Sequence, residues 1–267
     1  MVPFRHGQKN DPTDARALTE AGRRPRLPSV PVTSVEPQDI QAWHRVRERL
    51  VKNRTALVNQ IRGLLLEYGV VIPQGLSRLR QRLPGTLADA DNGLSFAFRE
   101  LLQNLVHELS ALDVSVAAVT QRLTRISRDL DACQRLQEMD GIGPLHATAL
   151  VAALGHGHDV RHGRQVAAWL GLVPRQYSSG GKTRLAGMSK RGNSYLRCLL
   201  MHGARSVVSR ARMTTDATSM WIRQLVVRVG MNKACVAVAN KMARVAWALL
   251  RTGEHDRQPE RTPGHAA

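Results

Sequence analysis

Two adjacent serines lie in a segment whose composition suits phosphate chemistry. Ser178 and Ser179 directly precede the pair Gly180-Gly181. Between residues 161 and 212 the chain has eleven Lys or Arg residues and no Asp or Glu. Unopposed positive charge destabilises a fold unless a polyanion neutralises it. We therefore expect these cations to surround a phosphodiester, with a serine placed to attack it. The cations are Arg161, Arg164, Arg175, Lys182, Arg184, Lys190, Arg191, Arg197, Arg205, Arg210 and Arg212.

Other interpretations of the serine segment fit its residues less well. A serine triad needs a His and a carboxylate, and neither lies close in sequence, although distant parts of the chain could supply them. A nucleotide-binding P-loop would need a glycine where Gln176 stands and a Val/Ile-rich strand before it. A turn that binds phosphate passively, or a solvated basic surface, stays open as an alternative.

Two carboxylates near the start of the chain are candidates for metal binding. Asp11 and Asp14 are three residues apart, so on a helix they face the same way and can share a hard cation such as Mg²⁺. The alternative is a helix start, with Asp11 before Pro12 as the N-cap. A second group, His156, His158 and His162, lacks the Cys or carboxylate partners of a metal site, so we expect it to bind none.

The composition of the whole chain points to nucleic acid. The 267 residues include 39 Lys or Arg against 21 Asp or Glu, a formal net charge of +18. Aromatic residues make up only 4%. We therefore expect contacts to the phosphate backbone rather than many stacked bases. Cys133, Cys198 and Cys235 form no closely spaced pair and are expected to be buried thiols without disulfides or zinc.

Helical periodicity dominates the chain. Short or long helices are expected at residues 11–21, 38–68, 76–83, 146–154, 165–170, 194–212, 217–230 and 233–250, with a brief extended piece at 172–177. No apolar run approaches the length of a membrane span. The fold class is therefore mainly α.

A heptad pattern runs through the middle of the chain for about four heptads. It predicts an antiparallel helical hairpin with residues 38–68, a coiled coil that pairs protomers, or an ordinary helix packed inside one subunit. The spacing alone does not choose among these. The seam consists of Leu105, Leu109, Leu112, Val116, Val119, Leu123, Ile126, Leu130 and Cys133.

A glycine-rich link lies between the seam and the next apolar helix. Gly141, Gly143 and Pro144 stand where a helix-hairpin-helix element would expose backbone N–H groups to a DNA phosphate. One copy is a weak signal, since other tight links between helices have the same composition.

Several blocks, in order, resemble the IS110-type transposases, especially the IS1111-like subgroup. The similarity runs from about residue 2 to 252, and the Ser-Ser-Gly and Lys-Arg-Gly-Asn blocks are the specific ones. The blocks are Lys9 to Ala15, His44 to Arg47, Arg54-Thr55, Asn59 to Leu65, Gly141 to Pro144, Trp169 to Pro174, Ser178 to Gly181, Ser189 to Asn193, Leu196-Arg197 and Ala239 to Arg244.

The resemblance implies a division of the chain and a set of catalytic residues. Residues 1–37 would be the remnant of an RNase H-like, RuvC-like domain with an Asp-Glu-Asp-Asp metal site, in which Asp11 and Asp14 are the last two acids. Residues 38–137 would be a helical hairpin or coiled coil, 138–252 a compact helical transposase domain, and 253–267 a disordered tail. Ser179, or else Ser178, would attack DNA. Gly141, Gly143, Lys182, Arg184, Lys190, Arg191 and Arg197 would bind it.

The chain departs from the family at its start, since the strands with the first Asp and the Glu have no counterpart. We expect an N-terminally truncated copy that binds Mg²⁺ weakly or not at all; a misplaced start, or a protomer that supplies the missing parts, is the alternative. The resemblance also implies DNA and an element-encoded guide RNA as partners. The coiled-coil interpretation of the seam predicts a homo-oligomer. Without an apolar span or the apolar core of a signal peptide, we expect a cytoplasmic, nucleoid-associated protein without a membrane anchor. The rival functions are a non-catalytic DNA/RNA-binding fragment and a dominant-negative partner of a full-length transposase.

Overall fold

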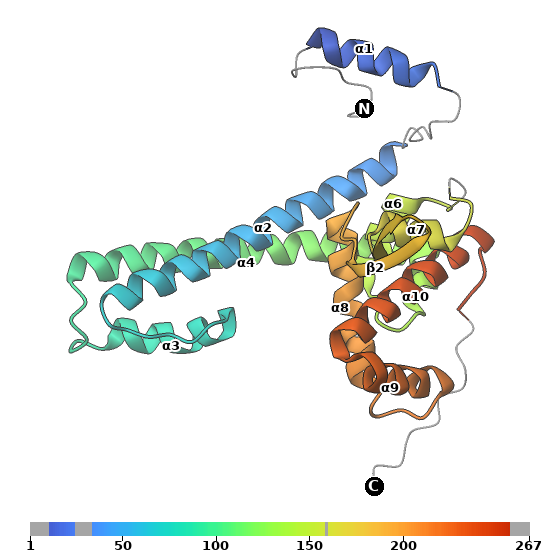
Figure 1. Ribbon diagram of the computed structural model, residues 1–267. Coiled ribbons are helices and arrows are strands. Elements are labelled where there is room, and N and C mark those ends of the chain that lie inside the picture. Colours follow the sequence, from blue (N-terminus) through green and yellow to red (C-terminus); the bar gives the residue numbers. More distant parts are fainter. Residues whose placement is uncertain (1–10, 25–33, 158–159, 257–267) are drawn as a thin grey trace. The chain divides into compact units, whose positions relative to one another are not determined.

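The described part of the chain is built mainly from helices. The structure is a computed structural model that describes residues 11–24, 34–157 and 160–256 (Figure 1). These residues form ten helices and two strands. The mainly α class is therefore confirmed. The chain divides into two units, Met1–Ser34 and Val35–Ala267.

In the first unit, the structure describes one helix with its short C-terminal extension. Helix α1, Asp11–Gly22, matches the short helix expected at residues 11–21, and Ala17 is its buried residue. Both Asp11 and Asp14 lie in its first turn, where negative charge is favourable beside the helix N-terminus. The residues at 1–10 and 25–33, which complete the predicted RuvC-like remnant, lie outside the described part of the chain.

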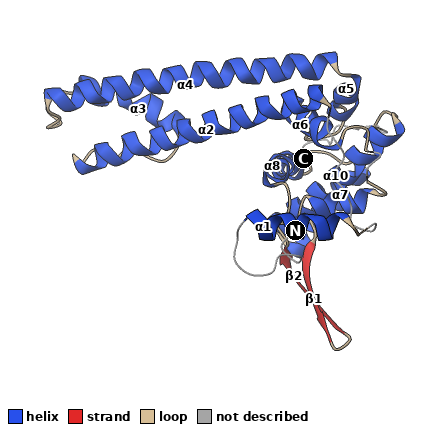
Figure 2. Cartoon of the chain, turned by 90° about the horizontal axis from the view of Figure 1, so that it is seen from above, coloured by secondary structure: helices blue, strands red, loops and turns tan. Residues whose placement is uncertain are grey.

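The second unit begins with a long antiparallel helical hairpin. Helix α2, Val35–Glu67, packs along α4, Phe96–Asp129 (Figure 2). Ile40 near the start of α2 packs with Val119 and Leu123 near the end of α4. The helical hairpin was one of the three interpretations of the heptad seam, and the contacts favour it because α2 covers the seam within the same chain.

The far end of this hairpin has a third helix and its own apolar cluster. Helix α3, Leu76–Ala88, packs Leu79 and Leu83 against the end of α2 and the start of α4. The helix was expected to stop at Leu83, but it continues through Pro84. A proline removes one backbone donor and one helical hydrogen bond. In the turn that follows Pro84, the Thr86 hydroxyl donates a hydrogen bond to the Arg82 carbonyl.

The heptad seam does not continue as one helix to Cys133. Leu130 has extended backbone angles (φ −98°, ψ 113°) and separates α4 from α5, Asp131–Gln137. Cys133 and Leu136 of α5 are fully buried in the C-terminal core. The seam therefore ends at a bend, and the helix beyond it belongs by its packing to the C-terminal domain.

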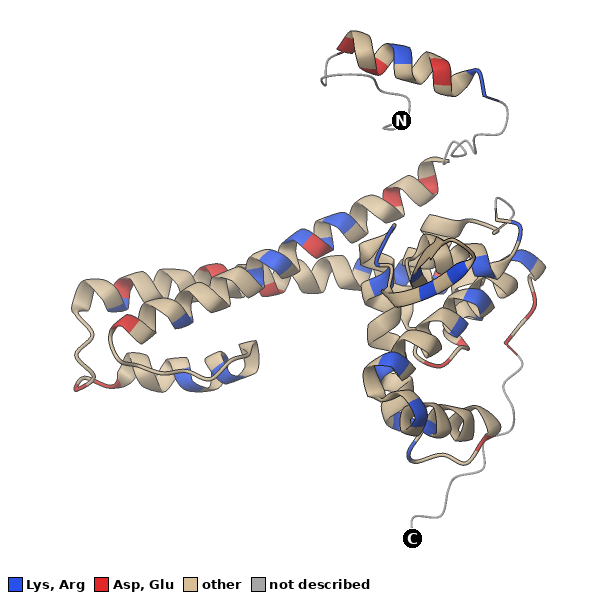
Figure 3. Cartoon of the chain, in the orientation of Figure 1, with Lys and Arg blue, Asp and Glu red and all other residues tan. Residues whose placement is uncertain are grey.

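The C-terminal domain is a packed group of helices around one apolar cluster. Its central element, α10, is apolar along one face and contacts α5, α7, α8 and α9. Lys and Arg residues occur on helices of this domain and on a β-hairpin that precedes α8 (Figure 3). The helices are α6 Pro144–Leu154, α7 Gly163–Trp169, α8 Ser194–Arg210, α9 Ala217–Val229 and α10 Met231–Thr252. Each was predicted from the periodicity with boundaries within about two residues.

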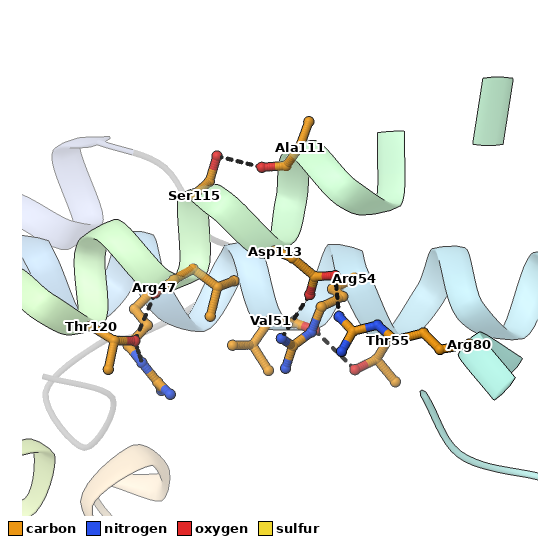
Figure 4. Close-up of polar contacts among 10 residues, drawn as sticks. Arg47, Val51, Arg54, Thr55, Arg80, Ala111, Asp113, Ser115 and Thr120 are labelled. Atoms are coloured by element: carbon orange, nitrogen blue, oxygen red, sulfur yellow. Dashed lines mark hydrogen bonds and ion pairs between the residues drawn. The ribbon is translucent and has the colours of Figure 1, made fainter. Parts of the chain in front are cut away.

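Polar contacts also connect the three helices of the long hairpin. The Asp113 carboxylate of α4 pairs with Arg54 of α2 at 3.2 Å and with Arg80 of α3 (Figure 4). Nearer the C-terminal domain, the Arg47 guanidinium donates from Nε to the Thr120 hydroxyl at 2.9 Å. These bonds set the register of α2 against α4, because each joins specific positions on the two helices.

The three cysteines differ in their exposure to solvent. All three cysteines are free thiols, but Cys198 is exposed on α8, whereas Cys133 and Cys235 are buried as expected. Cys198 lies on the outer face of its helix, which a pattern of apolar residues alone does not reveal.

Among the described residues, no helix has both the length and the apolar character that a membrane crossing requires.

Candidate functional site

The serine segment forms a β-hairpin at the edge of the C-terminal domain. Strand β1, Pro174–Ser179, pairs antiparallel with β2, Lys182–Met188 (Figure 2). Gly180 and Gly181 make the turn with φ of 54° and 74°. Positive φ at both central residues gives the tight turn that matches the twist of a hairpin, and glycine adopts it without strain. The extended piece expected at 172–177 is found two residues later, as β1. Strand β2 was not predicted from the sequence.

The strand register places Ser179 on the basic side of the hairpin. Ser179 lies opposite Lys182, and Tyr177 lies opposite Arg184. Because side chains alternate along a strand, these four residues share one face. A phosphate on this face meets a serine hydroxyl and two cations together.

Ser178 lies on the other face and already has a hydrogen-bond partner. The Gln176 amide donates from Nε2 to the Ser178 hydroxyl oxygen at 2.8 Å. The residue opposite Ser178 is Thr183, which has no charge. The two serines are adjacent in sequence, yet only Ser179 faces the cations.

The hairpin makes few contacts with the apolar core. Every residue of β1 is exposed, and Tyr177 and Leu185 keep 59% and 63% of their surface in contact with solvent. A two-stranded hairpin without an apolar covering is marginally stable in water. The exposed hairpin is therefore suited to be ordered further by a ligand that covers it.

A second basic segment follows the hairpin and leads into α8. Lys190 and Arg191 are exposed, and Lys190 has a positive φ of 55°, which is uncommon for a residue with a side chain. The Lys190 N–H donates to the Gly171 carbonyl at 3.2 Å. Asn193 caps α8, since its side chain accepts from the Leu196 N–H at 3.0 Å. The loop is thus held at both ends while its two cations face solvent.

Arg197, expected to bind DNA, has internal contacts. Its Nη1 donates to the carbonyl of Leu170 at 2.9 Å and to that of Arg191 at 3.0 Å. These bonds tie α8 to the end of α7 and to the Lys190-Arg191 loop. Arg197 therefore holds the Lys190-Arg191 loop in place through these hydrogen bonds.

A buried polar network lies behind the start of α8, and sequence reasoning missed it. The Tyr195 hydroxyl and His44 Nδ1 are 2.9 Å apart, and His44 Nε2 lies 3.0 Å from the Thr148 hydroxyl. The Thr148 hydroxyl itself donates to the Pro144 carbonyl at 2.8 Å. A consistent assignment has Tyr195 donating to Nδ1 and a neutral His44 donating from Nε2 to Thr148.

His44 is neutral at neutral pH. Burial, with the nearby Arg47 charge as a second cause, lowers the pKa of His44 to about 4. The neutral ring connects α2, α6 and α8, because its partners come from the latter two helices. The only sequence signal was a histidine at an apolar position of α2, since the partners are distant in the chain.

The glycine-rich turn before α6 packs closely against α8. A Cβ on Gly141 would lie 2.7 Å from the Gly203 carbonyl oxygen, so only two glycines allow this approach. The Gly143 N–H donates to His146 Nδ1 at 3.3 Å, and His146 Nε2 lies 2.9 Å from the Leu199 carbonyl, to which it donates. Burial is the main cause that lowers the pKa of His146. The lower pKa favours the neutral ring, in which Nδ1 can accept the hydrogen bond from the Gly143 N–H. Gly141 and Gly143 thus have internal contacts at the position where a phosphate grip was expected.

The two N-terminal carboxylates supply only part of a metal site. Asp11 is exposed and Asp14 half-buried, one turn apart on α1. Among the described residues no three His, Cys, Asp or Glu side chains come together as metal ligands. A hard cation takes about six oxygen ligands, so these two carboxylates alone do not complete its shell.

The expectation that the histidine group binds no metal stays a prediction. His156 and His162 lie at the two ends of the loop between α6 and α7, and His158 lies outside the described part of the chain.

Two family comparisons match separate segments of the chain. Residues 133–219 match the family described as "Transposase IS116/IS110/IS902 family", and residues 3–70 match a second family described as "Transposase". The first match spans α5, the serine hairpin and α8. The second spans α1 with Asp11 and Asp14, and all of α2.

Individual relatives are similar over almost the whole chain. The transposase for insertion sequence element IS1111A of Coxiella burnetii is 44% identical over 254 residues, which are 95% of this chain and 70% of that protein. A probable family 20 transposase of Pseudomonas aeruginosa is 45% identical over 94% of this chain and 74% of its own length. The transposase for element IS1328 of Yersinia enterocolitica is 35% identical with the same two coverages.

Proposed function

Because this chain belongs to the IS116/IS110/IS902 family of transposases, we propose that it binds DNA and cleaves and joins strands with Ser179 as nucleophile. The observation that carries the proposal is the shared face of Ser179, Lys182 and Arg184 on an exposed hairpin. Ser178 is the fallback nucleophile, but its hydroxyl bonds to Gln176 and lies on the uncharged face.

The proposed reaction is a transesterification at phosphorus. The Ser179 oxygen forms a bond to phosphorus, and the bond from phosphorus to one sugar oxygen breaks. The serine proton passes to solvent, and the leaving sugar oxygen takes up a proton. Lys182 and Arg184 stabilise the negative charge that develops on the phosphate oxygens. Joining reverses these steps with a new sugar hydroxyl.

The surrounding cations would hold the DNA backbone. Lys190 and Arg191 are exposed on the loop that follows the hairpin, and Arg197 fixes that loop from behind. Each phosphate neutralised adds about 0.9 to the log-log slope of affinity against salt concentration. Binding to duplex DNA should therefore weaken steeply as salt rises, and a flat response would refute this mode of binding.

We also infer that Asp11 and Asp14 contribute to Mg²⁺ binding, supported by their spacing on α1. No step above runs through the ion, since two carboxylates are an incomplete site. Titration calorimetry with Mg²⁺ tests this point against the double variant Asp11→Asn/Asp14→Asn. Equal heats for the two proteins would remove both residues from the metal site.

Four other features stay predictions. They are the division of the chain into domains after residues 37, 137 and 252, the RuvC-like origin of the N-terminal segment, the binding of a guide RNA, and the pairing of protomers along the helical hairpin. A helix-hairpin-helix grip at Gly141 and Gly143 also stays a prediction. In the structure, Gly141 packs against Gly203, and the Gly143 N–H donates to His146. A phosphate bound at this turn would have to bind beside these contacts or replace them.

The experiment that tests the proposed function compares two single variants on DNA that carries the element ends. Ser179→Ala should abolish strand cleavage and leave DNA affinity unchanged, because the hydroxyl is removed and the cations remain. Ser178→Ala is the matched control and should keep most activity. If Ser179→Ala cleaves as wild type does, the chain uses another nucleophile, and if neither wild type nor variant cleaves, the non-catalytic binding function is favoured.

A further inference from the structure

A second basic site lies between α7 and α10, formed by elements other than the serine hairpin. It is an open pocket of about 720 Å³. The start of α7 contributes His162, Gly163 and Arg164, and one face of α10 contributes Lys241, Arg244 and Trp247. The proposed strand-transfer step uses none of these residues.

The pocket concentrates positive charge. Arg164, Lys241 and Arg244 are exposed, and none of them forms an ion pair with a described acid. Lys241 and Arg244 are three residues apart on α10 and therefore neighbours on one helix face. Like charges at this spacing destabilise a helix. An anion that binds between them would remove this cost.

The backbone around the pocket is held in place before any ligand binds. Gly163 packs so closely on α10 that an added Cβ would lie 3.1 Å from the Arg244 Cα. Trp247 donates from its indole nitrogen to the Gly157 carbonyl at 3.0 Å, and Arg251 donates to the Arg161 carbonyl at 3.0 Å. The loop before α7 is thereby attached to α10, which places Arg164 beside Arg244.

The Lys241 ammonium is also oriented. It lies 4.8 Å from the ring centroid of Trp221, a residue of α9, at a distance typical of a cation–π contact. This contact leaves the charge unneutralised, since the ring is not an anion. Three cations from two helices are thus presented at one open surface.

We propose that this pocket binds a phosphodiester of nucleic acid, at a site separate from the serine hairpin. The inference rests on the proposed function in that the ligand is the nucleic acid on which a transposase acts. Three cations around an open pocket suit a continuous backbone of phosphates, which would neutralise charges that no described acid pairs with. DNA and RNA share this chemistry, and the experiment separates them.

The test measures affinity against salt concentration for one duplex DNA and one RNA of equal length, by fluorescence anisotropy. The variant is Arg164→Ala/Arg244→Ala. The matched control is Arg78→Ala/Arg82→Ala, which removes two exposed cations from α3. For the nucleic acid that binds here, the log-log slope should fall by about 1.8 in the pocket variant, which is about 0.9 for each phosphate that the pocket no longer neutralises.

The arms have distinct outcomes. A reduced slope with DNA alone or with RNA alone identifies the source of the phosphate, and a reduced slope with both assigns the pocket to either ligand. A slope equal to that of the control with both ligands overturns the proposal, as does a wild-type protein that binds neither. Circular dichroism verifies that each variant is folded.

Failure of this proposal is distinguishable from failure of the proposed function. Ser179→Ala should keep the wild-type slope, because it removes no charge. A pocket variant with a reduced slope would support the site even if Ser179→Ala still cleaved DNA. Conversely, an unchanged slope would leave the role of Ser179 untouched.

Discussion

At the scale of single residues, neighbours in sequence can have different chemistry. Ser178 and Ser179 carry the same hydroxyl, but the strand turns one toward Gln176 and the other toward Lys182 and Arg184. The difference follows from alternation along β1, so it depends on the register that the Gly180-Gly181 turn sets. A one-residue slip of that register would exchange the two serines.

The buried His44 makes the stability of the fold depend on pH. Its pKa of about 4 in the folded protein lies below the ordinary value of 6.5, so the unfolded chain binds more protons between these two pH values. The free energy of unfolding is therefore highest above pH 6.5. It should fall by about 3 kcal/mol as the pH drops to 4, from this residue alone.

Urea unfolding at pH 7, 5.5 and 4.5 measures this effect. His44→Gln should be less stable than wild type at pH 7 and should lose part of the pH dependence, since glutamine does not titrate. His107→Gln, at an exposed position of α4, is the control and should behave as wild type. The account of His44 would be wrong if the wild-type and His44→Gln proteins lost the same stability on acidification.

At the scale of the elements, the close contact of two backbones limits which residues fit between α8 and the turn before α6. A Cβ on Gly203 would meet the Gly141 carbonyl and would lie 3.2 Å from the Met242 side chain. Gly203→Ala should therefore lower the free energy of unfolding by about 1 to 3 kcal/mol through overpacking.

Gly63→Ala is the matched control for this change. Gly63 lies inside α2 with open space around it. Alanine should stabilise the protein there by about 0.4 to 1 kcal/mol, because it restricts the unfolded chain. Thermal unfolding of the two variants should shift the midpoint in opposite directions. Shifts of the same sign and size would contradict the packing of α8 on the turn.

The ion pairs of Asp113 connect the three helices of the long hairpin. Arg54 and Asp113 side chains are each 25% exposed, so the pair is partly shielded from solvent. Asp113→Asn keeps the shape, removes the charge, and leaves Arg54 and Arg80 to repel each other. We expect a destabilisation of about 1 kcal/mol that shrinks at high salt.

Glu108→Gln provides the comparison, since Glu108 is an exposed acid on the same helix. Guanidinium chloride carries its own salt, so urea unfolding at low and at high sodium chloride is the suitable measurement. Equal stability of the two variants at low salt would mean that the pairs of Asp113 contribute nothing to the hairpin.

These elements differ in how far the sequence could predict them. The long helices followed from apolar spacing, because each buries one face against a neighbour. Strand β2 was missed because its residues are almost all exposed and so carry no alternating pattern. The break at Leu130 was missed because the heptad pattern continues across it. The partners of His44 lie 104 and 151 residues away, where only the fold brings them together.

At the scale of the whole molecule, a formal charge of +18 is distributed so that different surfaces can hold a polyanion. The serine hairpin, the Lys190-Arg191 loop and the pocket between α7 and α10 all lie on the C-terminal domain. The network of His44, Thr148 and Tyr195 joins this domain to the long helical hairpin.

A covalent bond between the protein and DNA would be direct evidence that Ser179 is the nucleophile. Wild-type protein is incubated with DNA that carries the element ends, denatured, digested, and examined by mass spectrometry. The account predicts a nucleotide adduct on the peptide between Arg175 and Lys182, with the phosphate on Ser179, and no adduct in Ser179→Ala. An adduct on any other residue, or one that persists in Ser179→Ala, would contradict it.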